Sequence, residues 1–335
     1  MQTILEALHT ALSSGEDAVL AVILETTGST PRGVGAKMAL SPRRPPAGTV
    51  GGGALEQIAL RQGMELLSSR TSAKKHYTLS GGEVSNTGMI CGGAATLGFA
   101  YLSHEEPGTL AALDLALTLF RDSLPGWLTL EFPEAGPATL SVLRKASPGW
   151  AGLLLPRPSA SLCGPIRYAE PISAGRCYVF GGGHVGQALV PILGACGFRP
   201  TVFDDRPAVA DPALFPQAER VILGDFHRLG EHIAIREGDY VVTMTHGHGS
   251  DLTVLAQVLN TPAAYIGCLG SRKKAATVRQ KLLDLGFSPA EADRVHSPVG
   301  LPIGGETPAE IAVSIAAQMI QFRTEQAGGR RHGAV

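Results

Sequence analysis

Short apolar runs and stretches of helical spacing follow one another along this chain, and their order differs between its two halves. In the second half each apolar run is followed by a glycine-rich or polar turn, and most turns lead into a helical stretch. Such alternation is typical of a parallel doubly wound sheet with helices on its faces. We therefore predict an α/β fold with a C-terminal Rossmann-type domain at residues 174–328. The apolar runs cover residues 177–180, 200–205, 220–223, 239–245 and 263–269.

The first half begins with helical apolar spacing at Ile4, Leu5, Leu8 and Leu12. Further helical stretches begin near residues 55 and 107, among several strand-like segments. A proline-rich region at 155–175 then reads as a boundary. We predict a separate N-terminal α/β domain at residues 1–165. The strand-like segments cover residues 18–24, 36–40, 74–79, 99–102, 127–132 and 139–144.

The net charge and the cysteine content exclude several classes of protein. The formal net charge of −1 gives no electrostatic basis for binding nucleic acid or an anionic membrane. No apolar run approaches the roughly 20 residues that span a bilayer. The 5 cysteines are odd in number, contain no C-x-x-C pair and follow no secretory signal, as is typical of reduced thiols. We expect a cytoplasmic protein that binds neither nucleic acid nor membrane.

A glycine-rich turn follows the predicted strand at 177–180 and opens a helix. It has the G-x-G-x-x-G pattern, and a second predicted strand ends in two carboxylates about twenty residues later, as in dinucleotide-binding units. We predict a phosphate or nucleotide site here, with the carboxylates binding a ribose. Solvation of a strand end is the alternative for the carboxylates. The residues concerned are Gly181, Gly183, His184, Gly186, Asp204 and Asp205.

Two more loops are expected at the same edge, because the carboxyl ends of parallel strands lie together. Ser271, Arg272 and Lys273 begin a predicted helix, where cations oppose the macrodipole by about 0.3–1 kcal/mol each. A bound anion would reverse that cost, so we predict an anion site, with a solvated basic turn as the alternative. His246 and His248 lack i, i+4 spacing and a cysteine neighbour, which favours contacts with a ligand or backbone over metal binding.

The first half contains a second glycine-rich helix start and one cysteine in a polar setting. Gly51, Gly52 and Gly53 precede a helix whose N–H groups and dipole favour an anion. Cys91 follows a polar, glycine-rich loop and precedes two glycines, which would give a thiolate access and N–H donors. A packed thiol is the alternative. Packing is what we expect for the cysteines with apolar neighbours, Cys177, Cys196 and Cys268.

Several motifs together resemble the XdhC/CoxI family of xanthine dehydrogenase accessory proteins. They span nearly the whole chain in the expected order, and the segment that matches least is roughly 105–175. The residues that carry the resemblance are Gly28-Ser-Thr-Pro-Arg32, Gly35-Ala-Lys-Met38, Gly48-Thr-Val-Gly-Gly-Gly-Ala-Leu-Glu56, Cys91-Gly-Gly93, Val179-Phe-Gly-Gly-Gly-His-Val-Gly-Gln187, Phe203-Asp-Asp-Arg-Pro207, Thr243-Met-Thr-His-Gly-His248, Ile266-Gly-Cys-Leu-Gly-Ser-Arg-Lys273 and Thr307-Pro-Ala-Glu-Ile-Ala-Val-Ser-Ile315.

The resemblance implies an XdhC-type N-terminal domain, a C-terminal Rossmann domain and a chaperone for a molybdopterin-type molybdenum cofactor. Such a protein assists sulfuration of the cofactor with a cysteine desulfurase and inserts it into a xanthine dehydrogenase-like molybdenum hydroxylase. On this interpretation Cys91 is a molybdenum ligand or sulfur relay, while Arg32, Lys37 and residues 51–53 hold anionic groups of the pterin. The Rossmann half takes a phosphate or a nucleotide, either NAD(P) or the cytidine dinucleotide form of the cofactor.

An NAD(P)-dependent oxidoreductase is the rival interpretation, with the N-terminal domain binding its substrate. The chain has no evident Tyr-x-x-x-Lys pair for hydride transfer, although His246 or His248 could serve. Asp204 and Asp205 would then favour NAD over NADP by repelling a 2′-phosphate. We favour an accessory protein over a catalyst, and we expect a homodimer.

Overall fold

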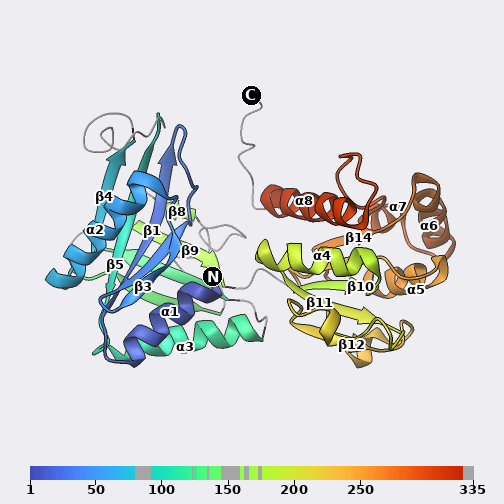
Figure 1. Ribbon diagram of the computed structural model, residues 1–335, viewed down its shortest axis with the longest axis horizontal. Coiled ribbons are helices and arrows are strands. Elements are labelled where there is room, and N and C mark those ends of the chain that lie inside the picture. The colour runs from blue at the N-terminus through green and yellow to red at the C-terminus, as the bar shows by residue number, and fades with distance from the viewer. Residues whose placement is uncertain are drawn as a thin grey trace. The chain divides into compact units, whose positions relative to one another are not determined.

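The computed structural model divides into two compact units, Met1–Ser173 and Ala174–Val335, and each is described by itself (Figure 1). No helix in the described part of the chain is long and apolar enough to cross a membrane. The structure describes residues 1–79, 92–122, 124, 126–133, 136–144, 159–161, 166–172 and 176–326.

The first unit is built on a five-stranded antiparallel sheet in the order β3-β2-β1-β5-β4. Its central strand is buried on both faces, because alternate side chains of β1 enter two different cores. Leu20 and Val22 face one core, whereas Val19 and Ala21 face the other. This explains the continuous apolar run predicted at 18–24. The strands are β1 (Ala18–Thr27), β2 (Lys37–Ser41), β3 (Arg44–Thr49), β4 (Ala73–Thr78) and β5 (Ala94–Leu102).

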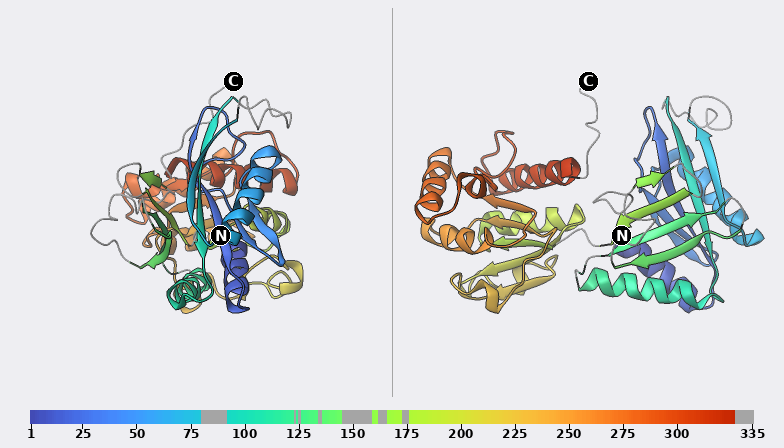
Figure 2. Two further views of the ribbon diagram at one scale, coloured as in Figure 1. Left: turned by 90° about the vertical axis from the view of Figure 1, so that its left-hand side faces the viewer. Right: turned by 180° about the vertical axis from the view of Figure 1, so that it is seen from behind.

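Helix α2 (Gly53–Ser69) covers one face of this sheet. The other face packs against α1 (Gln2–Ser13) and α3 (Pro107–Arg121), which lie side by side (Figures 1 and 2), and against a second sheet. The second sheet is antiparallel and has the order β7-β6-β9-β8. Its strands are β6 (Trp127–Phe132), β7 (Thr139–Leu143), β8 (Ser159–Ser161) and β9 (Ile166–Pro171).

The second sheet includes part of the region that the sequence marked as a boundary, within which the two units divide. The region at 155–175, interpreted as a boundary, contains β8 and β9, and β9 pairs with β6 along its whole length. Pro171 is the last residue of β9 and lies opposite Trp127 of β6. The first unit therefore extends past residue 165.

The second unit confirms the predicted Rossmann-type sheet. Its strands are all parallel and lie in the order β12-β11-β10-β13-β14-β15, which is 3-2-1-4-5-6 along the chain. The direction of this order reverses between β10 and β13, where such folds bind their ligands. The strands are β10 (Arg176–Phe180), β11 (Arg199–Asp204), β12 (Arg220–Leu223), β13 (Tyr240–Thr243), β14 (Tyr265–Cys268) and β15 (Val295–His296).

Helices pack on both faces of the parallel sheet (Figure 1). α4 (His184–Ala195) and α8 (Pro308–Gln326) share one core, whereas α5 (His248–Val258), α6 (Arg272–Asp284) and the short α7 (Pro289–Ala292) contribute to the other. The segments on either side of β12 contain only the 3-10 turns η2 (Pro212–Leu214) and η3 (Leu229–Glu231). α8 begins with a capping box, since Thr307 and Glu310 exchange hydrogen bonds of 3.3 and 2.9 Å.

Candidate functional site

The three glycines of the Rossmann turn differ in why a side chain would or would not fit at each position. Gly181 has a φ of +117°, and a methyl group there would lie 2.3 Å from the carbonyl oxygen of Met244. A methyl group on Gly186 would lie 2.3 Å from the carbonyl oxygen of Gly181, so this glycine permits close packing of α4 on the turn. Gly183, at the N-cap of α4, faces open space. A ligand can therefore approach the backbone at Gly183.

Asp204 lies beneath this turn and is fully buried at the end of β11. Its carboxylate accepts hydrogen bonds from Gly182 N at 2.8 Å, from Arg206 N at 3.0 Å and from Arg206 Nε and Nη2 at 2.9 Å each. Burial raises the pKa of this carboxyl, but the bonds from Arg206 and Gly182 outweigh it and lower the pKa overall. These four bonds occupy the acceptor positions of Asp204. Of the two carboxylates predicted to bind a ribose, Asp205 is therefore the one that remains available, because its side chain is exposed.

The loops after β13 and β14 also lie at the carboxyl edge of the sheet, as predicted from parallel pairing. A buried ion pair joins them: Lys274 Nζ donates to Asp251 Oδ2 at 2.5 Å and to the carbonyl oxygen of Leu269 at 2.8 Å. Asp251 also accepts from the backbone and hydroxyl of Thr245. This pair fixes the two loops relative to each other.

The remaining predicted groups at this edge are exposed. Arg272 and Lys273 begin α6, and neither forms an ion pair within the described part of the chain. Ser271 is the N-cap of α6 and accepts from Lys274 N at 3.2 Å, so its oxygen is already engaged. His184 and His246 are also exposed, whereas the side chain of His248 is not described. Among the described residues, no three His, Cys, Asp or Glu side chains are grouped as a metal site requires.

Three glycine-bearing segments of the first unit meet at one end of its five-stranded sheet. A methyl group on Gly28 would lie 3.0 Å from the Cα of Gly93 and 3.1 Å from the carbonyl oxygen of Gly92. A methyl group on Gly51 would lie 2.9 Å from the Cβ of Pro31. The loop after β1 therefore lies against the backbone of the segment before β5 and, through the side chain of Pro31, against the start of α2. We call this convergence the glycine cluster.

The helix start within the glycine cluster is partly occupied by the chain itself. Gly51, Gly52 and Gly53 have φ values of 135°, 72° and 57°, a backbone that favours glycine. Glu56 Oε2 accepts hydrogen bonds from Gly52 N, at 3.0 Å, and from the Thr49 hydroxyl. The bond from Thr49 is the main cause of the lowered pKa of Glu56. A carboxylate therefore already binds one of the amides predicted to hold an anion.

The two cations predicted for the first unit have different environments. Arg32 is exposed beside Gly51 and forms no ion pair with another described residue. Lys37 Nζ donates to Glu170 Oε2 at 2.7 Å, and the two side chains are only 11% and 7% exposed. This ion pair joins β2 to β9, so Lys37 could contact a pterin only by leaving Glu170. Arg32 is the predicted cation that remains available at the glycine cluster.

The described cysteines lie in the second unit. Cys177 and Cys268 are fully buried in strands, which confirms their packed role, and burial raises the pKa of both thiols. Cys196 is half-buried at the C-terminus of α4. Cys91, for which a thiolate role was predicted, lies outside the described residues.

Four groups at these sites were not predicted from the sequence. Arg206 stands two residues after Asp204 and Glu56 stands in the first turn of α2, so local spacing could have indicated both. Glu170 binds Lys37 across 133 positions and Lys274 binds Asp251 across 23. No local signal in one sequence marks such distant pairs.

Two family models match the chain. The model described as the XdhC Rossmann domain matches residues 177–319, and the model of the XdhC and CoxI family matches residues 11–78. These matches fall in the second and the first unit, respectively.

The chain is also similar to named proteins. It is 34% identical over 148 residues to a Bacillus subtilis protein described as a probable xanthine dehydrogenase component, covering 44% of this chain and 43% of that one. The chain spans less than half the length of the curated relatives that it matches at this level of identity. It is 24% identical over 325 residues to the molybdenum cofactor insertion chaperone PaoD of Escherichia coli, covering 97% of this chain and 89% of that one.

A solved structure has the same fold. A protein from Bacillus halodurans described as a xanthine dehydrogenase superposes with a TM-score of 0.77 at 23% identity, covering 99% of this chain and 98% of that one. At this identity the similarity establishes the fold alone.

Proposed function

The chain belongs to the XdhC and CoxI family, and from this premise we propose that it serves in the maturation of a molybdenum enzyme. It binds a molybdopterin-type molybdenum cofactor as cargo, supports its sulfuration and delivers it to a xanthine dehydrogenase-like hydroxylase. The observation that carries the proposal is the similarity to a molybdenum cofactor insertion chaperone along 97% of this chain. A cysteine desulfurase as sulfur source and a homodimer are further parts of the proposal.

The glycine cluster supports a cargo site in the first unit. Gly28 lies there against the backbone of Gly92 and Gly93, and exposed Arg32 lies beside Gly51. Anionic groups of a pterin suit a guanidinium, and they suit the helix-start amides once Glu56 is displaced. Cys91 is bonded to Gly92, which belongs to the cluster, and a thiolate is a ligand that soft metals prefer. We assign to Cys91 the molybdenum contact or the sulfur transfer.

The Rossmann unit supports a phosphate or nucleotide site of its own. The open Gly183 and the exposed His184 lie at the turn after β10. Asp205 follows β11, and Arg272 and Lys273 begin α6. A dipeptide of cations at a helix start reinforces the attraction of the dipole for a phosphate. We propose that this unit binds the cytidine dinucleotide portion of the cofactor or a separate nucleotide.

Cofactor retention by the purified chain tests the role of Cys91. The protein is produced in a molybdenum-sufficient host, and released ligands are identified by mass spectrometry. We expect Cys91→Ala to lose bound cofactor and to fail in activating an apo-hydroxylase. Cys196→Ala, which removes a half-buried thiol of the second unit, is the matched control and keeps both properties. Equal retention and equal activation by the Cys91 variant would rule out the role assigned to this residue.

An NAD(P)-dependent oxidoreductase is a second candidate, because the preformed glycine turn and the 3-2-1-4-5-6 strand order are those of dinucleotide-binding folds. Titration with NADH separates the two functions. Saturable binding together with turnover of a carbonyl substrate would replace the chaperone proposal. Binding without turnover would place the nucleotide in the Rossmann unit and leave the proposal intact.

A further inference from the structure

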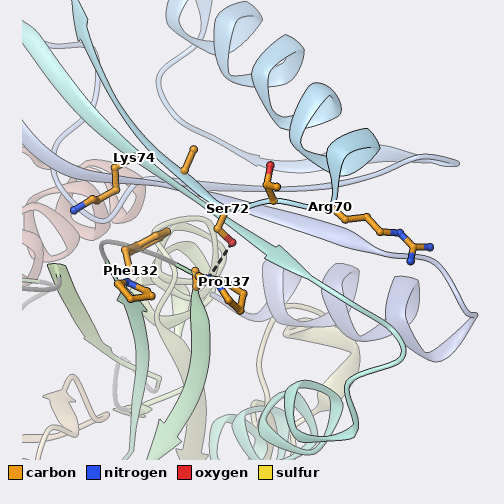
Figure 3. Close-up of a pocket in the computed structure, with 10 residues that line it drawn as sticks. Arg70, Ser72, Lys74, Phe132 and Pro137 are labelled. Atoms are coloured by element: carbon orange, nitrogen blue, oxygen red, sulfur yellow. Dashed lines mark hydrogen bonds between the residues drawn. The ribbon is translucent and has the colours of Figure 1, made fainter.

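The first unit contains a groove of about 860 Å³ away from the glycine cluster. It lies between the start of β4 and the residues 132–133 and 136–138 (Figure 3). Ser72 bridges the two sides, because its hydroxyl accepts a hydrogen bond from Ala138 N at 3.1 Å. The Phe132 ring is buried at the groove, and a methyl group on Gly98 would lie 2.6 Å from it. The groove is therefore held open by packed residues on both sides.

The charged side chains that line the groove are both cationic. Arg70 and Lys74 extend toward opposite ends of it, with Ser72 between them (Figure 3). Lys74 is exposed and forms no ion pair within the described part of the chain. Arg70 is 63% exposed, and its nearest carboxylate, Asp17, is 3.8 Å away and already accepts from Tyr101 at 2.6 Å. Lys74 thus presents positive charge without a counter-ion in the described part of the chain, whereas the charge of Arg70 is shared with Asp17.

Arg70 is held in an uncommon backbone conformation at this place. It is the C-cap of α2, with φ 54° and ψ 43°, and among the described residues no other non-glycine residue has a positive φ. For a side chain as large as arginine this conformation costs about 1–3 kcal/mol. This left-handed C-cap ends α2 directly before the groove-lining residues 71–74.

The groove runs beside an open edge of the five-stranded sheet. β4 is a terminal strand of this sheet and pairs with β5 alone in the described part of the chain. The opposite edge, β3, contains Pro45 and Pro46, which lack N–H donors and so block strand addition. β4 contains no proline. Of these two edges, β4 is therefore the one whose composition permits the addition of another strand.

We propose that the groove and the β4 edge bind an extended acidic segment of a partner protein by strand addition. The segment pairs its main chain with β4, while its carboxylates meet Arg70 and Lys74. An extended acidic peptide fits better than a compact anion, because the two cations lie at opposite ends of the groove and the main-chain groups lie between them. The site does not depend on cofactor binding and can fail or succeed independently of the proposed function.

The test uses the full chain and a capped, fluorescein-labelled decapeptide that alternates Asp or Glu with Val or Thr. We expect saturable binding by fluorescence anisotropy that weakens as salt screens the charges. Lys74→Glu should weaken binding about tenfold, because attraction becomes repulsion. Lys75→Glu is the matched control: Lys75 is also exposed but pairs with Leu97 and so lies on the opposite face of β4. It should change affinity by about twofold at most.

Main-chain pairing is measured separately by hydrogen exchange. Peptide binding should slow exchange of amides within 73–78 and leave those within 44–49 unchanged. No binding, equal weakening by the two lysine variants, or binding without protection of β4 would each overturn the proposal. Sedimentation measures the oligomeric state of the wild type and of Lys74→Glu. If the wild type is a dimer, the variant is a monomer and no peptide binds, the proposal is overturned and the groove is the contact with a second copy of this chain. Both lysines are exposed, so both variants are expected to fold, and circular dichroism verifies this.

Discussion

Each unit places a carboxylate against a glycine-rich helix start, but the two carboxylates occupy different positions. In the second unit Asp204 comes from a neighbouring strand and binds Gly182 N from below, with Arg206 balancing its charge. In the first unit Glu56 comes from the helix itself and folds back onto Gly52 N. The Rossmann turn is therefore supported by an acid that leaves Gly183 open. At the start of α2, in contrast, Glu56 itself occupies the amide of Gly52.

This difference separates a preformed site from one that must rearrange. A phosphate can approach Gly183 without displacing any side chain. An anion that needs the amide of Gly52 must first displace Glu56 and break its bond to Thr49. Binding at the first unit therefore carries a conformational cost that binding at the second unit lacks. Variants at the two helix starts should differ accordingly.

The largest effect is expected for Gly181→Ala, because the new methyl group meets a backbone carbonyl at 2.3 Å in a conformation with positive φ. We expect a loss of about 3 kcal/mol in the unfolding free energy of the second unit. Both tryptophans, Trp127 and Trp150, belong to the first unit, so their fluorescence follows that unit alone. Circular dichroism in urea should show the loss while the fluorescence midpoint stays unchanged.

Gly183→Ala is the control for this prediction. Its methyl group meets open space and its φ is −69°, so stability should change by less than about 0.5 kcal/mol. Ligand affinity in the Rossmann unit should fall instead. Equal destabilisation by the two alanines would show that the turn is not constrained as described.

A smaller loss is expected for Asp204→Asn. The amide keeps the shape but removes the charge and one acceptor, so Arg206 loses its carboxylate partner and a buried donor is left unpaired. We expect about 2 kcal/mol of destabilisation, measured by circular dichroism in urea. Asp205→Asn should leave stability unchanged, because that side chain is exposed. If Asp205→Asn destabilises as much, the burial of Asp204 does not explain the effect.

Local signals in the sequence predicted the parts of these sites that depend on neighbouring residues. The run from strand through glycines to helix located Gly181, Gly183 and Gly186, since each role follows from chain direction at a parallel strand. Alternation of strands and helices was sufficient to predict the parallel sheet.

What the sequence did not predict depends on residues far apart in the chain. Lys37 was interpreted as a pterin contact on the family resemblance, yet Glu170 pairs with it from another sheet. Asp204 was interpreted as a ribose acceptor from its spacing, yet its orientation depends on the turn above it and on Arg206. Residue type and spacing locate a charged group, but its partners decide whether it remains available to a ligand.

The smallest effect is expected for Glu56→Gln, which keeps the shape of the side chain but removes the charge from the start of α2. We expect a loss of about 1 kcal/mol in the first unit, followed by tryptophan fluorescence in urea. Because the pKa of Glu56 is lowered in the folded chain, its contribution is present above about pH 4 and is lost as the pH falls further. The difference in unfolding free energy between the wild type and the variant should therefore disappear at low pH. Glu65→Gln, an exposed change near the other end of α2, should show neither effect. A difference between wild type and Glu56→Gln that is the same at pH 3 and pH 7 would mean that the charge of Glu56 is not its cause.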